Sequence, residues 1–256
     1  MSAKVIALST NKGGVLKTSV TAHLAPIWAK QGKKVLIIDM DGQGNSAMSF
    51  GKIPKKIEDT MYDVLIDGMA AEVAIMNVYE NIDLLPSNKK MRFFENDLKG
   101  PNKLLRLKNA VNHLRKEYDV ILVDSPPTLG TTQGNILAFV DQVIIPFQPE
   151  PFSQLSLVEI VEGIEDIQEN LNKELRILGI LATLVDSRAG LHSETIQEAR
   201  AYCDKKGWYM FETVIPRSIR FATELKRNGL PATISLPKHP MVQHYFELAK
   251  EIEERW

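Results

Sequence analysis

The chain has 256 residues, of which 44% are hydrophobic and 25% are charged, as expected for an ordinary globular protein, and it has a single cysteine, Cys203. The formal net charge of −1 means that nucleic-acid binding would require a local basic patch, and one cysteine excludes both a disulfide framework and a cysteine-ligated cluster built by one chain. No signal-peptide pattern and no run of about 18 apolar residues occurs, so we expect a cytoplasmic protein without a membrane-spanning helix.

Apolar strand-like segments alternate with helical segments along the whole chain. The predicted strands are Lys4–Ser9, Lys34–Asp39, 81–87, Asp119–Asp124, Gln142–Phe147 and Arg176–Val185. The predicted helices are 17–31, 102–118, 153–171, 191–206 and 240–254. Buried strands separated by helices are typical of a parallel sheet that is covered on both faces. We therefore predict an α/β fold with a mostly parallel, doubly wound sheet, and a single domain spanning residues 1–256.

A glycine-containing loop, NKGGVLKTS (11–19), joins the first predicted strand to the first predicted helix. Lys17 and Thr18 stand where the phosphate-binding pattern G-x-x-x-x-G-K-[ST] requires them, but Leu16 replaces the glycine before the lysine. Backbone N–H groups of such a loop, together with the helix N-terminus, bind phosphate oxygens. Lys17 would reach the β- and γ-phosphates, and the Thr18 hydroxyl would bind Mg²⁺. On this segment alone, a glycine-rich turn that binds nothing remains the alternative.

Three carboxylates follow predicted strands. Asp39 and Asp41 come at the end of the second strand, and Asp124 ends the fourth. Ligands of parallel sheets collect at the carboxyl ends of the strands, so these side chains should face the glycine loop. A single such aspartate is as easily a helix cap or a turn residue, whereas three beside this loop favour a nucleotide and metal site.

These segments resemble the ParA/MinD group of deviant Walker A ATPases, which have the P-loop NTPase fold, and within that group the ParA/Soj-type DNA partition ATPases. The similarity extends from about residue 3 to the C-terminus, and it is clearest in segments 12–19, 35–46, 118–130, 179–188 and 213–232. The resemblance implies a slow ATP hydrolase that uses ATP and Mg²⁺ and forms a sandwich homodimer around two ATP molecules.

The resemblance also implies roles for individual residues. The nucleotide-binding set is Lys12, Gly13, Gly14, Val15, Leu16, Lys17, Thr18 and Ser19, with Pro216 in the adenine-contacting segment. Lys12 would reach the partner's nucleotide and supply a positive charge in trans, comparable to an arginine finger. Lys17 and Asp41 complete the catalytic set, Asp41 by positioning or activating the attacking water. Thr18, Asp39 and Asp124 form the Mg²⁺ site, with Asp124 acting through water.

The chain departs from the family pattern at two positions. Gly42 replaces the proline usual in D-x-D-P-Q, which loosens the turn but removes no ligand. Leu16 places a Cβ and an isobutyl group beside the phosphates, where they would clash or shift the loop unless the side chain points onto the sheet or the dimer interface. A pseudo-ATPase, which binds DNA or protein without turnover, is therefore the alternative to an active enzyme.

A local basic surplus lies in the C-terminal part. Between 217 and 238 the chain has Arg217, Arg220, Lys226, Arg227 and Lys238 against Glu224 alone. Such a run unaided is most simply a solvated face. The resemblance assigns Arg188 and Arg220 to non-specific DNA binding by the ATP dimer, a role that suits forked phosphate donors. It also implies a ParB-like centromere-binding partner and a nucleoid-associated, ATP-bound state.

Two other functions remain as alternatives. A membrane-cycling, MinD-like ATPase requires a basic amphipathic C-terminal helix, but the tail HYFELAKEIEERW has four glutamates and reads as a helix packed through Tyr245, Leu248 and Ile252. We therefore expect no membrane partner. An iron–sulfur carrier requires bridging cysteines, which Cys203 alone does not supply. The five histidines show no metal-ligand spacing, and we interpret them as structural or surface residues.

Overall fold

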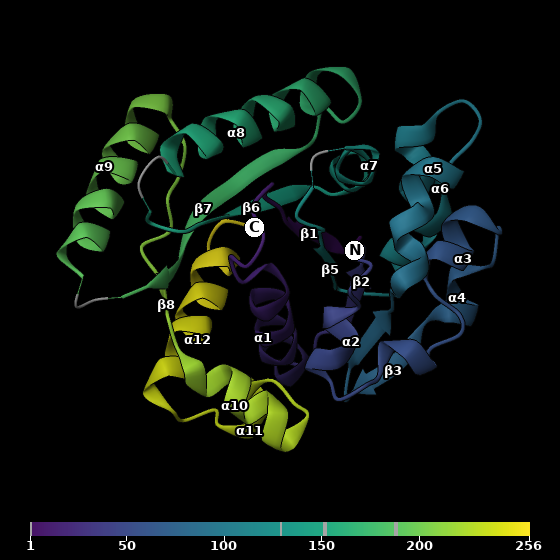
Figure 1. The fold of residues 1–256 in the computed structure, drawn as a ribbon, viewed down its shortest axis with the longest axis horizontal. Helices are drawn as coiled ribbons and strands as arrows, with labels where there is room; N and C mark the ends of the chain where they lie inside the picture. The colour runs from purple at the N-terminus through teal and green to yellow at the C-terminus, as the bar shows by residue number, and fades with distance from the viewer. Residues whose placement is uncertain (1, 129, 151–152, 187–188) are drawn as a thin grey trace.

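One eight-stranded sheet organises the computed structural model of the protein (Figure 1). The structure describes residues 2–128, 130–150, 153–186 and 189–256, without the side chains of 154, 155, 219, 220 and 222. The strands are β1 Lys4–Leu8, β2 Val35–Asp39, β3 Met76–Tyr79, β4 Ile82–Leu85, β5 Val120–Asp124, β6 Gln142–Phe147, β7 Arg176–Val185 and β8 Ile215–Pro216. Their order is β3-β4-β2-β5-β1-β6-β7-β8, and every neighbouring pair is parallel except β3 and β4.

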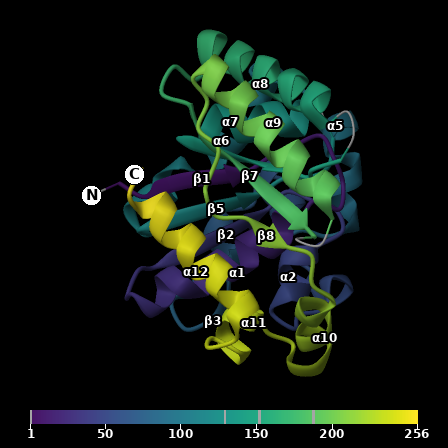
Figure 2. The same cartoon turned by 90° about the vertical axis from the view of Figure 1, so that its left-hand side faces the viewer.

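Helices cover both faces of the sheet, as Figure 2 shows from the side. The α-helices are α1 Lys17–Lys30, α2 Asn45–Ser49, α3 Met61–Ile66, α4 Ala71–Ala74, α5 Phe94–Asp97, α6 Arg106–Val111, α7 Thr131–Phe139, α8 Ser153–Asn170, α9 Gly190–Lys206, α10 Ile219–Asn228, α11 Ala232–Ser235 and α12 Pro240–Glu253. Short 3₁₀ helices are η1 Pro54–Lys56, η2 Lys89–Phe93, η3 Lys103–Leu105 and η4 Asn112–Lys116.

The sheet separates two apolar cores. One core lies under α1 and α12 and is centred on Trp28, Tyr245 and the β1 residues Ile6 and Leu8. The other lies under α3 and α6–α9, and the alternate β1 residues Val5 and Ala7 point into it. Successive side chains of a strand point to opposite faces, so strands buried on both faces must be apolar throughout. The predicted α/β, doubly wound fold is therefore confirmed.

The predicted helix 102–118 is wrong as a single element. The segment divides into η3, α6 and η4, although its apolar side chains, such as Leu107 and Leu114, are buried as predicted. The buried Asn135 of α7 explains one boundary: its side-chain oxygen accepts from the Leu107 N–H at 3.0 Å, and its amide donates to the Lys103 carbonyl at 2.9 Å. These bonds satisfy backbone groups that an uninterrupted helix would pair internally.

The C-terminal helix packs as predicted. Tyr245, Leu248 and Ile252 of α12 are fully buried against α1, and they belong to the same core as Trp28. Across the described parts of the chain, no helix combines the length and apolar character that a bilayer span requires.

Candidate functional site

The loop between β1 and α1 has two residues with positive φ. Gly14 has φ 73°, and Leu16, the N-cap of α1, has φ 67° and ψ 20°, in the left-handed region that favours glycine. The Leu16 carbonyl still accepts the first helical hydrogen bond, from the Val20 N–H at 2.8 Å. Leu16 therefore starts α1 from a left-handed backbone conformation, which costs a leucine about 1–2 kcal/mol.

Lys17 is buried inside this loop. Its ammonium group donates to the Lys12 carbonyl at 2.9 Å and to the Thr10 carbonyl at 3.3 Å. Burial lowers the pKa of Lys17, and the nearby carboxylates of Asp124 and Asp41 oppose that shift. The loop thus holds a desolvated cation where phosphate oxygens would neutralise it.

Asp124 and Asp39 lie at the carboxyl ends of neighbouring strands, in direct register across β5 and β2. The Thr18 hydroxyl donates to Asp124 Oδ2 at 2.6 Å, and the Ser46 hydroxyl donates to the same oxygen at 3.0 Å. Asp39 accepts from the backbone N–H groups of Asp41 at 2.9 Å and Ser46 at 3.1 Å. The sheet register and the start of α2 therefore bring both predicted carboxylates to Thr18.

This carboxylate pair carries more negative charge than its neighbours balance. Both side chains are fully buried, and Asp124 Oδ1 has no hydrogen-bond partner. Burial raises the pKa of Asp124 to about 6, and burial together with the charge of Asp124 raises the pKa of Asp39 well above its usual range. An unpartnered carboxylate oxygen beside a hydroxyl suits a hard divalent cation such as Mg²⁺. The described residues include no cluster of three or more His, Cys, Asp or Glu side chains arranged as a metal site, so a cation here would complete its shell with water and phosphate oxygens.

A cavity of about 230 Å³ lies above these groups. It is lined by residues 13–19 of the loop with Asp41, Asn45, Ser125 and Pro127. The Asp41 carboxylate accepts from the Gln43 N–H at 2.9 Å, which fixes it at the rim. Loop N–H groups, a buried lysine and an aspartate around one small cavity are a combination that suits a phosphate chain.

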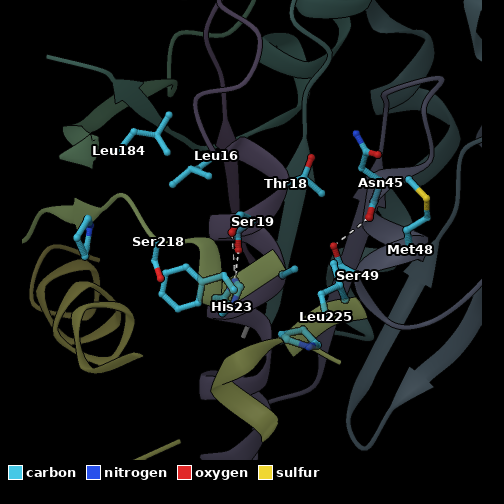
Figure 3. Close-up of a pocket in the computed structure, with 14 residues that line it drawn as sticks. Leu16, Thr18, Ser19, His23, Asn45, Met48, Ser49, Leu184, Ser218 and Leu225 are labelled. Atoms are coloured by element: carbon cyan, nitrogen blue, oxygen red, sulfur yellow. Dashed lines mark hydrogen bonds between the residues drawn. The ribbon is translucent and has the colours of Figure 1, made fainter. Parts of the chain in front are cut away.

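A larger, mainly apolar cavity of about 410 Å³ adjoins the first, because Leu16, Thr18, Ser19 and Asn45 line both. Figure 3 shows its lining residues, drawn from α1, α2, the end of β7 and the segment from β8 to α10. Pro216, which the resemblance assigned to the adenine-contacting segment, is on its wall. The volume and apolar lining suit the base and ribose of a nucleotide whose phosphates occupy the smaller cavity.

His23 forms part of the floor of the larger cavity. Its ring stacks on Tyr245 with 4.3 Å between centroids, and it meets Phe221 edge-on at 5.3 Å. Nδ1 lies 2.6 Å from the Ser19 carbonyl, and Nε2 accepts from the Ala232 N–H at 3.2 Å, so the neutral tautomer with hydrogen on Nδ1 satisfies both. Burial lowers the pKa of His23 to about 4. The interpretation of this histidine as structural fits these contacts, but the sequence did not place it at the site.

Lys12 pairs within its own chain. Its ammonium group lies 2.5 Å from Glu150 Oε2, just after β6, and both side chains are about two-fifths exposed. The hydrogen bond from Lys12 lowers the pKa of Glu150. The predicted reach of Lys12 across a dimer involves a second chain, so it stays a prediction.

Gly42 packs closely against the η2 segment. A Cβ at this position would lie 3.1 Å from the Arg92 Cγ and 3.4 Å from the Arg92 backbone nitrogen. The usual proline would therefore crowd the η2 segment. The departure at this position is a local accommodation that leaves Asp39 and Asp41 in place.

The two predicted DNA-binding arginines are only partly covered by the structure. Arg188 lies outside the described residues, and Arg220 is described only by its backbone in α10. The segments that carry them are nevertheless adjacent, because Val185 pairs with Pro216 and its carbonyl accepts from the Arg217 N–H at 2.9 Å. Arg217, Lys226, Arg227 and Lys238 are exposed.

Several site residues escaped the sequence analysis. Ser46, which donates to Asp124, lies in the quoted segment 35–46, and its position five residues after Asp41 was the available clue. Glu150 follows a predicted strand end and could have been found by the rule that identified Asp124. Leu184, Phe221 and Leu225 gave no local clue, because only the tertiary fold brings them to the cavity.

Comparisons with known proteins agree with this geometry. Residues 3–177 match the family model described as AAA domain. The chain is 33% identical to sporulation initiation inhibitor protein Soj of Bacillus subtilis, over 97% of this chain and 98% of that protein. It is 32% identical to chromosome partitioning protein ParA of Myxococcus xanthus, over 98% of this chain and 88% of that protein.

Solved structures with the same fold contain nucleotides. Cobyrinic acid a,c-diamide synthase from Mycobacterium smegmatis with bound ATP analog and magnesium superposes with a TM-score of 0.87 at 28% identity, covering 99% of this chain and 95% of that one. A putative plasmid partition protein from Borrelia burgdorferi B31 bound to AMPPNP gives a TM-score of 0.84 at 25% identity, covering 99% and 100%. Together with the full-length sequence matches, these findings show that the chain belongs to the AAA-domain family and, within it, to the ParA/Soj-type partition ATPases.

Proposed function

We propose that this protein is a DNA partition ATPase whose ATP-bound form is a sandwich homodimer that binds DNA without sequence preference. The observation that carries this proposal is the convergence of Lys17, Thr18 and Asp124 beneath a cavity the size of a phosphate chain. That cavity opens into a second one suited to a nucleoside. The ATP analog and magnesium in the Mycobacterium smegmatis structure support ATP and Mg²⁺ as the ligands.

Each part of the site has a role in this proposal. The backbone of residues 13–19 binds the phosphates, and Pro216 borders the base. Thr18 would hold Mg²⁺, with Asp39 beside it and Asp124 acting through water. The ion would neutralise the carboxylate pair and polarise the phosphate oxygens. Lys17 stabilises negative charge on the β- and γ-phosphates, and Asp41 orients the attacking water.

Dimer formation completes the site. In the proposed cycle, Lys12 leaves Glu150 and reaches the nucleotide of the partner subunit. Lys12 then supplies a positive charge where negative charge develops in the transition state, as an arginine finger does. Because the Lys12–Glu150 pair is half-exposed, breaking it costs little, about 0–1 kcal/mol.

DNA binding follows from the position of the basic segment. β8 and α10 border the nucleoside cavity, and they carry or adjoin the exposed Arg217, Lys226 and Arg227. Arg220 also belongs to α10, whereas Arg188 comes after β7 in the sequence and lies outside the described residues. A dimer presents this surface twice, so a dimer that forms with ATP binds DNA more tightly. By reciprocity, DNA raises the affinity of the protein for ATP by the same factor. Contacts to phosphates alone make the affinity steeply dependent on salt. A ParB-like partner would stimulate hydrolysis and release the protein from the nucleoid into the cytoplasm.

A gel shift on random-sequence duplex DNA at fixed low salt tests the proposal, with ATP, ADP or no nucleotide. We expect a shift with ATP alone, lost in the variant Arg220→Ala, and slow ATP hydrolysis that Asp41→Ala abolishes. Lys116→Ala, at an exposed lysine outside the basic segment, is the matched control and should shift DNA normally.

Two results would contradict parts of the proposal. A shift that ignores nucleotide, together with no hydrolysis above the Asp41→Ala background, would favour the pseudo-ATPase in which Leu16 has uncoupled the site. No shift under any condition, with hydrolysis intact, would remove DNA as the partner and retain the ATPase.

A further inference from the structure

Two leucines of this protein have backbone conformations that leucine ordinarily avoids. Among the non-glycine residues that the structure describes, positive φ occurs at Leu16 (67°), Asn81 (57°), Asn102 (58°) and Leu184 (55°). Asparagine tolerates this region, whereas leucine pays about 1–2 kcal/mol for it. Such conformations persist only where the surrounding structure holds them, and they cluster at functional sites.

The two strained leucines converge on one cavity. Leu16 caps α1, and Leu184 lies where the pairing of β7 with β8 is irregular, between the pairs Thr183–Ile215 and Val185–Pro216. An irregularity of this kind redirects a strand side chain. Both leucines line the 410 Å³ cavity, and Figure 3 draws both at its upper end, opposite His23 and Leu225.

Leu16 stands at the junction of the two cavities. It lines both cavities, and Figure 3 draws its side chain at the larger one. Leu16 also packs against the core under α1. A ligand with phosphates in the smaller cavity must pass this side chain where its ribose begins. The glycine of the usual loop would offer no apolar surface there.

We propose that Leu16 and Leu184 form an apolar clamp on the ribose and base of the bound nucleoside triphosphate, with Leu16 as the residue that makes nucleoside contacts in place of the usual glycine. This inference rests on the proposed function, because it concerns the same ATP site. The opposite wall is rigid, since the His23 ring is stacked on Tyr245 and bonded on both nitrogens. The clamp therefore gains affinity from contact area with the nucleoside and adds nothing to binding of the phosphates.

The clamp separates nucleoside binding from phosphate binding, and calorimetric titration with Mg²⁺ can measure each. The ligands are ATP, ADP and inorganic tripolyphosphate, and the variants are Leu16→Ala, Leu16→Gly and Leu184→Ala. We expect both Leu16 variants to bind ATP and ADP roughly tenfold more weakly, the effect of uncovering about 50 Å² of apolar surface. Tripolyphosphate affinity should stay within about twofold, because the loop N–H groups and Lys17 remain.

Three controls make the result specific. Leu16→Met keeps an apolar side chain of similar reach and should retain ATP affinity within about threefold. Leu171→Ala removes an exposed leucine elsewhere and should change nothing. Leu16→Gly relieves the backbone strain whereas Leu16→Ala retains it, so equal losses of affinity in these two assign the effect to the side chain. Circular dichroism verifies that each variant is folded.

The possible outcomes are distinct. Tighter or unchanged ATP binding in Leu16→Gly would overturn the clamp, as would a parallel loss of tripolyphosphate affinity, which would place the effect in the phosphate loop. If the unchanged protein binds ATP, and Leu16→Gly and Leu16→Ala bind it just as tightly, the clamp is overturned and the proposed function stands. If it binds none of the three, the proposed function fails and the clamp fails with it.

Discussion

The proposed nucleotide site consists of two adjoining cavities: the 230 Å³ cavity is its phosphate half, and the 410 Å³ cavity is its nucleoside half. The two halves are built on different physical grounds. In the phosphate half, Lys17, Asp39 and Asp124 are buried charges, held by short hydrogen bonds to the backbone and to hydroxyl groups at the ends of three strands. In the nucleoside half, the walls are apolar side chains from α1, α2, β7, β8 and α10. One half depends on charge, and the other depends on packing.

That difference teaches where each kind of change should act. A buried charge has no substitute when it is removed, so changes in the phosphate half should cost activity by large factors. Each substitution in a wall of apolar side chains removes only part of the contact area, so changes in the nucleoside half should give graded effects on affinity and stability. Leu16 lines both cavities. The affinities of its variants for ATP and for tripolyphosphate therefore distinguish the nucleoside half from the phosphate half.

The largest expected effect is that of Lys17→Ala, which would make the difference between the halves most visible. The variant removes the buried cation beneath the phosphate cavity, so we expect ATP hydrolysis to fall at least about 100-fold. Alanine favours helix, so α1 should form normally, and thermal unfolding can verify this. Lys30→Ala, at the exposed end of the same helix, is the control and should hydrolyse ATP at the original rate. A Lys17→Ala variant within tenfold of that rate would show that charge does not dominate the phosphate half.

Asp124→Asn should affect function and stability in opposite directions. Hydrolysis that depends on Mg²⁺ should fall by about 100-fold, because the carboxylate beside Thr18 is lost. Burial raises the pKa of Asp124 to about 6, so this group favours the folded state at low pH, and that contribution is lost as pH rises through about 6. Without Mg²⁺ at pH 8, the variant should therefore be more stable than the unchanged protein by about 1–3 kcal/mol, with a smaller difference at pH 5.

Urea unfolding at the two pH values measures this difference, and Asp59→Asn, at an exposed aspartate, should show none. Lower stability of Asp124→Asn at pH 8 would mean that the hydrogen bonds from Thr18 and Ser46 outweigh the burial of the charge.

His23 tests the nucleoside half, where the expected effect is on stability and is smaller. Its folded pKa of about 4 lies below the ordinary value, so the neutral ring stabilises the fold above about pH 6.5, and this contribution is lost as pH falls toward 4. By pH 5 the loss should reach about 2 kcal/mol. His23→Gln, which can accept from the Ala232 N–H, should remove that pH dependence and leave the other four histidines unchanged. Equal slopes of stability against pH in the two proteins would contradict the neutral, buried state of His23.

The sequence by itself determined six of the eight strands, without β3 and β8, and the residues that meet beneath the smaller cavity. The six apolar runs became β1, β2, β4, β5, β6 and β7 to within two residues, because strands buried on both faces must be apolar throughout. Lys17, Thr18, Asp39 and Asp124 met as expected, because each lies within a residue of a strand end or helix start and parallel strands end at one edge. The local sequence pattern was sufficient wherever the place of a residue in the fold followed from the strand or helix to which it belongs.

The tertiary structure decided what depends on contacts between distant segments. Asn135 divides the predicted helix 102–118, and Gly42 packs closely against Arg92. The direction of the Leu16 side chain was open from the sequence, and it follows from the left-handed backbone at the start of α1 and from the core that receives it. Leu184 is about 170 residues from Leu16 in the sequence, and it reaches the same cavity where the pairing of β7 with β8 is irregular. No local pattern encodes such a contact. Packing across the fold therefore fixed the nucleoside half, whereas strand ends and one loop fixed the phosphate half.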